Sequence, residues 1–202
     1  MNKMQCVTVG YLDNNCYLVL IGSSLYVIDP AADAPVILAK IRESFPHEKA
    51  AILLTHAHAD HLGAVGEVAR ELAAGYVMLD PGDLALYENP ANSILPWIPH
   101  PDDLPETVPA ADRPDFRVIR TPGHTPGGVC YFFPELPALF SGDTLFYQSV
   151  GRTDLPGGDA ALLTKCIRER IFTLPDALAV YPGHGPATTV GGEKTANPYV
   201  RG

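Results

Sequence analysis

Four side chains that can bind a metal ion lie within six residues of one another. His56, His58, Asp60 and His61 belong to the segment T-H-A-H-A-D-H at 55–61, at the end of the apolar run Ala50–Thr55. Polar groups crowded at the edge of an apolar core each need a partner. A divalent cation would satisfy all four at once, and neutral imidazole and carboxylate are ligands that suit zinc, iron or manganese.

An alternative reading of this segment is the start of a helix, with Asp60 as a cap and the histidines as solvated polar residues. That reading would suffice for one isolated histidine, but three of them directly after an apolar run favour a metal site. The spacing also differs from H-E-x-x-H, so the segment is not a zincin helix.

Three later segments repeat the arrangement of expected strand, sharp loop and metal-binding side chain. His124 lies in T-P-G-H-T-P-G-G, Asp143 in S-G-D-T and His184 in Y-P-G-H-G-P. Pro and Gly favour tight turns, and loops at one edge of a sheet can converge on one point. His47 and His100 lack this context and are predicted to be surface residues.

The candidate donors comprise five histidines and two aspartates. One zinc ion uses three or four ligands, so seven donors suffice for two metal ions if one carboxylate bridges them. Two ions ~3.5–4 Å apart can hold a water molecule between them and make it a nucleophile at neutral pH. We therefore expect two divalent ions, with zinc favoured and iron or manganese as alternatives.

The elements that must position these donors are short strands separated by helices. Apolar runs and turn residues predict strands at 5–9, 15–21, 24–29, 50–55, 76–79, 117–120, 128–133, 138–141 and 177–181. Helical spacing predicts helices at 35–45, 62–74 and 160–172, with a terminal helical turn at 193–200. Gly22-Ser23 predicts a hairpin between the second and third strands. This pattern indicates an α/β fold with two sheets faced by helices.

Residues 80–115 are rich in Pro, Asp and Asn and are predicted to form a loop-rich insertion with one short helix near Asp83–Tyr87. The insertion carries Trp97, which together with Tyr87 is attributed to loop packing and left out of the predicted site.

Composition limits the class of protein. The 202 residues are 47% hydrophobic with a net charge of −9, which suits one globular domain and disfavours nucleic acid as a partner. No apolar run is long enough to span a bilayer, and no signal peptide is recognised. Four widely spaced cysteines, Cys6, Cys16, Cys130 and Cys166, predict reduced thiols and a cytoplasmic protein.

The order and spacing of H-x-H-x-D-H, P-G-H-T, S-G-D-T and P-G-H-G resemble the metallo-β-lactamase-fold superfamily, from about Tyr11 to Asn197. The resemblance implies an αββα four-layer sandwich, with two mixed sheets flanked by helices and the metals at one sheet edge. It implies two ligand groups with one bridging residue: His56, His58 and His124; Asp60, His61 and His184; and Asp143 between them.

Within that superfamily, G-D-T-L-F and G-R-T-D-L-P-G-G-D resemble the short glyoxalase II-like hydrolases, which cleave hydroxyacyl-glutathione thioesters. Asp143 stands where β-lactamases of the family generally carry Cys or Ser. Full-length glyoxalase II adds a C-terminal helical domain with basic glutathione contacts. Here 18 residues follow His184, so we expect residues 1–202 to form one domain without it.

This resemblance implies attack of a metal-bridging hydroxide on a small-molecule thioester. Asp60 would orient the hydroxide. A thiol has a pKa of about 8.5, so a thiolate can leave without a strong general acid. Arg152 is the candidate anchor for a substrate carboxylate, and a structural ion pair with Asp154 or Asp159 is the equally weighted alternative.

Two rival functions remain open. A persulfide dioxygenase shares this fold and needs one iron held by two histidines and one aspartate, here His56, His124 and Asp143. The P-G-H-G motif around His184 favours the hydrolase. A metal-binding scaffold would hold metal without turnover. Neither the oligomeric state nor the acyl group and thiol carrier follow from the sequence.

Overall fold

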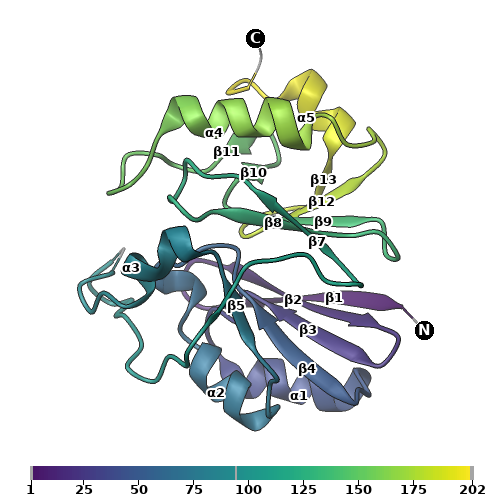
Figure 1. Cartoon of the computed structure of the whole chain (residues 1–202), viewed down its shortest axis with the longest axis vertical. Helices are drawn as coiled ribbons and strands as arrows, with labels where there is room; N and C mark the ends of the chain where they lie inside the picture. Colours follow the sequence, from purple (N-terminus) through teal and green to yellow (C-terminus); the bar gives the residue numbers. More distant parts are fainter. Residues whose placement is uncertain (1, 94, 201–202) are drawn as a thin grey trace.

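Two β-sheets lie face to face in the computed structural model, and helices cover the outer face of each (Figure 1). The structure describes residues 2–93 and 95–200. The N-terminal half forms one sheet with its helices, and the C-terminal half forms the other. The predicted αββα sandwich is therefore confirmed.

The first sheet has six strands in sequential order: β1 Lys3–Val9, β2 Asn14–Ile21, β3 Ser24–Ile28, β4 Lys49–Leu53, β5 Val77–Leu79 and β6 Val108–Pro109. β1, β2 and β3 pair antiparallel, which confirms the hairpin at Gly22-Ser23, whereas β3 to β6 run parallel. Every residue of β2 is buried, as expected of a strand covered on both faces.

The second sheet has five strands in the order β13-β12-β9-β8-β7: β13 Thr188–Thr189, β12 Ala179–Pro182, β9 Ala138–Gly142, β8 Val129–Phe133 and β7 Arg117–Arg120. β12 pairs parallel with β9 and the other neighbours pair antiparallel, so both sheets are mixed. β10 Leu145–Phe146 and β11 Ser149–Val150 form a separate two-stranded sheet beside them.

Three apolar cores separate the four layers. The first lies between the first sheet and the helices α1 Ala34–Ser44 and α2 Val65–Glu71; α1 buries Ala34, Ile37, Leu38 and Ile41, one face of a helix. The middle core, between the sheets, is rich in aromatic rings such as Phe116 and Phe133. The third lies under α4 Ala160–Cys166 and α5 Val190–Ala196.

Three helical segments differ from the sequence prediction. The helix expected at 62–74 is confined to α2, because a 3₁₀ turn at Ala59–His61 turns Asp60 and His61 inward before it. The helix expected at 160–172 is α-helical to Cys166 and then continues as a π-helix over Ile167–Ile171. The turn expected at 193–200 lies earlier, as α5.

The insertion at 80–115 is not loop throughout. It contains α3 Leu84–Tyr87, as predicted, but it ends in β6, which pairs with β5 and completes the first sheet. His47 and His100, predicted as surface residues, are partly buried and belong to neither donor group. A ring nitrogen of His47 lies 2.7 Å from Phe45 O, and one of His100 lies 2.6 Å from Tyr87 O.

The four cysteines are free thiols, with Cys6 exposed and the other three buried. Within residues 2–93 and 95–200, no helix has the length and apolar character that crossing a membrane requires.

Candidate metal centre

The first donor loop leaves the end of β4 and enters the space between the two sheets. Its four candidate donors are all buried: His56, His58, Asp60 and His61. The backbone N–H of Val129 donates to Thr55 O at 2.8 Å, which fastens the loop to the second sheet. The 3₁₀ turn then closes with His61 N donating to His58 O.

The other three donors follow strands of the second sheet. His124 follows β7, Asp143 follows β9 and His184 follows β12. A side chain at Gly123, where φ is +135°, would place its Cβ 2.4 Å from Leu163 N, and one at Gly183 would lie 2.3 Å from Asp143 Oδ1. Only glycine fits such close approaches, which explains the Pro-Gly-His motifs.

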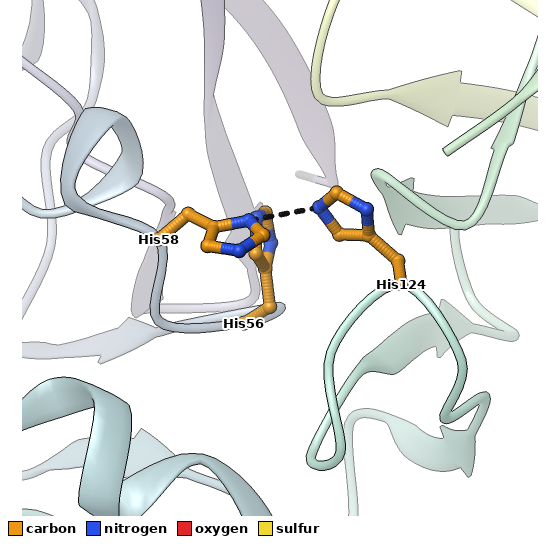
Figure 2. Close-up of side chains that lie close together, drawn as sticks. All are labelled: His56, His58 and His124. Carbon is orange, nitrogen blue, oxygen red and sulfur yellow. Dashed lines mark hydrogen bonds between the residues drawn. The ribbon is translucent and has the colours of Figure 1, made fainter. Parts of the chain in front are cut away.

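The first group of donors consists of His56, His58 and His124, which come from two different loops (Figure 2). One ligand atom from each residue can be chosen so that all lie within 4.8 Å of one another. His58 Nδ1 lies 2.9 Å from His124 Nε2. Three imidazoles that converge in this way present the ligand set of a zinc or iron site.

The second group consists of Asp60, His61 and His184. Asp60 Oδ2 lies 3.6 Å from His61 Nε2 and 3.4 Å from His184 Nε2. Asp143 lies between the two groups. Its Oδ1 is 3.6 Å from His61 Nε2, and its Oδ2 is 3.7 Å from both His124 Nε2 and His184 Nε2. The structure thus brings all seven predicted donors together.

The outer ring nitrogens of these histidines have partners of their own. His56 Nδ1 faces Thr55 Oγ1 at 3.1 Å, and His61 Nδ1 faces Asp29 Oδ2 at 3.2 Å. The Nδ1 atoms of His124 and His184 lie 2.7 Å from Arg152 O and 2.9 Å from Leu12 O. Partners of this kind fix a ring's tautomer and direct its other nitrogen toward a metal.

Four buried ligand atoms have no hydrogen-bond partner among the described residues: His56 Nε2, Asp60 Oδ1, His61 Nε2 and Asp143 Oδ1. Buried polar atoms in native proteins are almost always paired. All four belong to the predicted donors, so the residues present fit a divalent metal centre, whose cations would satisfy them.

The electrostatics of the two groups differ. Burial, reinforced by neighbouring histidines, lowers the pKa of His56 well below its ordinary value and that of His58 to about 3. Both rings are therefore neutral at pH 7, as a metal ligand must be. Burial also opposes the charge on His61, but Asp60 and Asp143 outweigh it and raise the pKa of His61 to about 10.

Three polar residues that the sequence analysis missed support the donors. Asp29, at the end of β3, accepts from Thr55 N and Thr55 Oγ1 and faces His61. Asn14 donates to Asp60 Oδ2 at 3.1 Å. Asp83 accepts from Ala57 N, Thr125 Oγ1 and Gly127 N and so joins the loops of the first donor group. Asp29 alone had a sequence signal, a carboxylate as the last residue of the strand predicted at 24–29.

Arg152 contributes its backbone to this centre, through the carbonyl that faces His124. Its exposed guanidinium pairs with Asp154 through two contacts of 2.8 Å, from Nε to Oδ1 and from Nη2 to Oδ2. The ion pair predicted as an alternative for Arg152 is therefore present, with Asp154 as the partner.

Proteins similar in sequence include named hydrolases. A probable metallo-hydrolase of Streptococcus pyogenes is 35% identical over 198 residues, which are 92% of this chain and 84% of that protein. The hydroxyacylglutathione hydrolase GloC of Haemophilus influenzae is 31% identical over 98% of each chain.

Solved structures agree over nearly the whole chain. The B3 metallo-beta-lactamase BLEG-1 has a TM-score of 0.88 and 36% identity, over 99% of this chain and all of that one. TTHA1623, solved in a di-iron-bound form, has a TM-score of 0.88 and 41% identity, over 96% of this chain and 99% of that one. ETHE1 from Myxococcus xanthus has a TM-score of 0.76 and 26% identity, over 97% of this chain and 83% of that one.

The metallo-beta-lactamase superfamily domain itself matches residues 9–184, a span that starts at the end of β1 and ends on the last candidate donor, His184. With a fold, a donor cluster and full-length relatives that all agree, the chain belongs to the metallo-beta-lactamase superfamily and is a metallo-hydrolase of that fold.

Proposed function

We propose that the protein hydrolyses thioesters of the hydroxyacyl-glutathione type at a centre of two divalent metal ions. Two observations carry this proposal: two groups of three donors both lie near Asp143, and four buried ligand atoms have no hydrogen-bond partner among the described residues. The likeness to GloC, named a hydroxyacylglutathione hydrolase, supports the substrate class.

His56, His58 and His124 would hold one ion, Asp60, His61 and His184 the other, and Asp143 both. Divalent ions at these positions would supply hydroxide at neutral pH, because metal binding lowers the pKa of water to about 7. Zinc is the metal we favour, while the di-iron form of TTHA1623 and the donor chemistry keep iron and manganese as alternatives.

Asp60 has a second role in the proposal. Asn14 donates to its Oδ2, whereas Oδ1 is buried without a partner. A carboxylate held on one oxygen can accept a hydrogen bond from the attacking water on the other and so orient it. The leaving thiol has an ordinary pKa of about 8.5, so its departure needs no protein acid.

Arg152 remains the proposed anchor for a carboxylate of the thiol carrier. Its guanidinium is 54% exposed and already bound bidentately by the Asp154 carboxylate. A substrate carboxylate would replace Asp154 in the same geometry.

The second candidate is a persulfide dioxygenase with a single iron. His56, His124 and Asp143 offer the two-histidine, one-carboxylate set that such an iron uses. A single iron at that set gives the second donor group, Asp60, His61 and His184, no metal to bind. Two ligand atoms of this group, Asp60 Oδ1 and His61 Nε2, would then stay buried without a hydrogen-bond partner. The hydrolase therefore accounts for more of the site.

Elemental analysis of the purified protein, paired with assays on two substrates, separates these functions. The hydrolase predicts two ions per chain and thiol release from S-lactoylglutathione. One iron per chain with oxygen uptake on glutathione persulfide, and no thiol release, would establish the dioxygenase instead. Metal without turnover on either substrate would favour the scaffold.

Asp143→Ala tests the bridging role. We expect the variant to lose bound metal and at least about 100-fold in kcat/KM, since one carboxylate neighbours both donor groups. Asp102→Ala, which changes an exposed aspartate, is the matched control and should keep its bound metal and its kcat/KM. A full rate in Asp143→Ala would show that the residue does not bridge.

A further inference from the structure

A cavity of about 280 Å³ opens beside the second donor group and has no role in the chemistry described above. Its lining includes Tyr11, Asn14, Ala32, Asp60, Trp97 and Ile98. Asn14 and Asp60 belong to the candidate metal centre, because Asn14 donates to Asp60 and lies 3.3 Å from His184 Nε2. One end of the cavity therefore adjoins the candidate metal centre at Asp60.

The rest of the cavity is apolar and uncharged. Ala31, Ala59 and Gly63 also line it, and Asp60, at the centre, is the one charged side chain among its described lining residues. Tyr11 is 85% exposed and Trp97 is 60% exposed, and both side chains line the cavity. Their rings can therefore contact a ligand that enters it.

The size and charge of the cavity decide which part of a thioester fits. Sites for drug-sized molecules occupy about 300–1,000 Å³, so this cavity suits one substituent of a substrate. Glutathione carries carboxylates and an ammonium group, which an apolar cavity without cations would leave unpaired. The acyl substituent is the part that can enter.

We propose that this cavity is the acyl pocket, that Tyr11 and Trp97 form its walls, and that it selects thioesters with an uncharged, apolar acyl chain. The proposal rests on the proposed thioester hydrolysis for its substrate. It adds that longer apolar acyl groups are preferred over the lactoyl group and over acyl groups that end in a carboxylate.

Kinetics on the metal-loaded protein test the preference. Along the series S-acetyl-, S-butyryl- and S-hexanoylglutathione, kcat/KM should rise about fourfold per added CH₂ until the pocket is full, as expected for about 0.8 kcal/mol per buried methylene. S-succinylglutathione should fall below S-butyrylglutathione. A flat series, or a preference for succinyl, would overturn the proposal.

Trp97→Ala should remove most of the rise in kcat/KM between S-acetylglutathione and S-hexanoylglutathione, because the longer acyl chain loses the wall that it contacts. Tyr199→Ala is the matched control, since Tyr199 is an aromatic residue of similar exposure, 61%, that does not line the cavity. Equal chain-length dependence in Trp97→Ala and the unaltered protein would show that Trp97 does not form the pocket.

Binding without turnover separates this inference from the proposed function. Trp97 is the single tryptophan of the chain, so its fluorescence reports the pocket directly. In chelator-treated protein, the thioether S-hexylglutathione should shift that emission at concentrations where S-methylglutathione does not. A shift without thioester hydrolysis would retain the pocket and reject the hydrolase, whereas hydrolysis without a shift would do the reverse.

Discussion

Three of the donor histidines differ in how strongly they hold protons, and this difference comes from their neighbours. Burial and the neighbouring imidazoles lower the pKa of His56 and of His58. His61 lies between carboxylates that raise its pKa to about 10. His56 and His58 are therefore neutral and ready to bind metal in mildly acidic solution, while protons compete with metal for His61.

The stability of the metal-free protein should fall as the pH is lowered from 7 to 5. The pKa of His58 is about 3 in the folded protein, against an ordinary 6.5, so below pH 6.5 the unfolded chain binds a proton that the folded chain does not. The stabilisation from His61, whose pKa is raised to about 10, is lost as the pH rises toward 10 and is fully present only below pH 6.5. It therefore opposes the trend near pH 7, whereas below pH 6.5 the loss from His58 continues and dominates.

Urea unfolding of chelator-treated protein at pH 7, 6 and 5 measures the effect. His58→Asn replaces the titrating ring with an amide and should reduce the dependence of the unfolding free energy on pH, while His56, whose pKa is also lowered, keeps part of it. If the variant and the unaltered protein lose stability in parallel, His58 does not have the lowered pKa described here.

At the scale of single residues, the sequence predicted the candidate metal ligands but not the polar residues that hydrogen-bond to those ligands and their loops. Histidine clusters after apolar runs identify donors, because few other roles explain them. Asn14 and Asp83 are single polar residues, and nothing in their spacing indicates that they face a donor loop. Their roles arise only when segments far apart in sequence meet.

At the scale of elements, the segment around α3 holds the donor loops in place. Asp83 is fully buried and accepts three hydrogen bonds, from Ala57 between two donors, from Thr125 next to His124, and from Gly127. One carboxylate therefore fixes the spacing between the loop after β4 and the loop after β7.

Asp83→Ala should leave the hydrogen-bond donors Ala57 N, Thr125 Oγ1 and Gly127 N without their acceptor. We expect metal affinity to fall about 10–100-fold, as is typical when partners behind the ligands are removed, together with a loss of about 1–3 kcal/mol in stability. Metal titration of the apo variant and its thermal midpoint measure the two effects. The exposed Asp102→Ala serves as control; a loss of stability with unchanged metal affinity would limit Asp83 to a structural role.

Strand prediction succeeded for the strands of three or more residues and failed for the strands of two residues. β2 and β4 were predicted because both faces are covered. β6, β10, β11 and β13 contain two residues each, too few for any periodicity, and they exist because a neighbouring segment supplies hydrogen-bond partners. The π-helical turn after α4 likewise has no signature in residue type.

For the whole molecule, the metal centre lies where the two halves meet. His56, His58, Asp60 and His61 come from the half that forms the first sheet, while His124, Asp143 and His184 come from the half that forms the second. Bound cations would therefore join the two halves at the candidate metal centre. The two sheets that these halves form face each other in Figure 1.

Removal of the metal should lower thermal stability. A ligand present at 100 times its dissociation constant stabilises the folded state by about 2.7 kcal/mol. For a chain of this length that corresponds to a shift of about 5–10 °C in Tm. Calorimetry before and after chelation, with zinc added back as control, tests this; an unchanged Tm would mean that the cations do not join the halves.

The order of strands along the chain has one more consequence. The last strand of the first sheet, β6, ends at Pro109, and the first strand of the second sheet, β7, begins at Arg117, so neither half threads through the other. Two fragments severed in this connection would each keep an entire sheet but only part of the ligand set. Their reassociation would then depend on the cation concentration, because a bound cation would contribute to the affinity between the two separately made fragments.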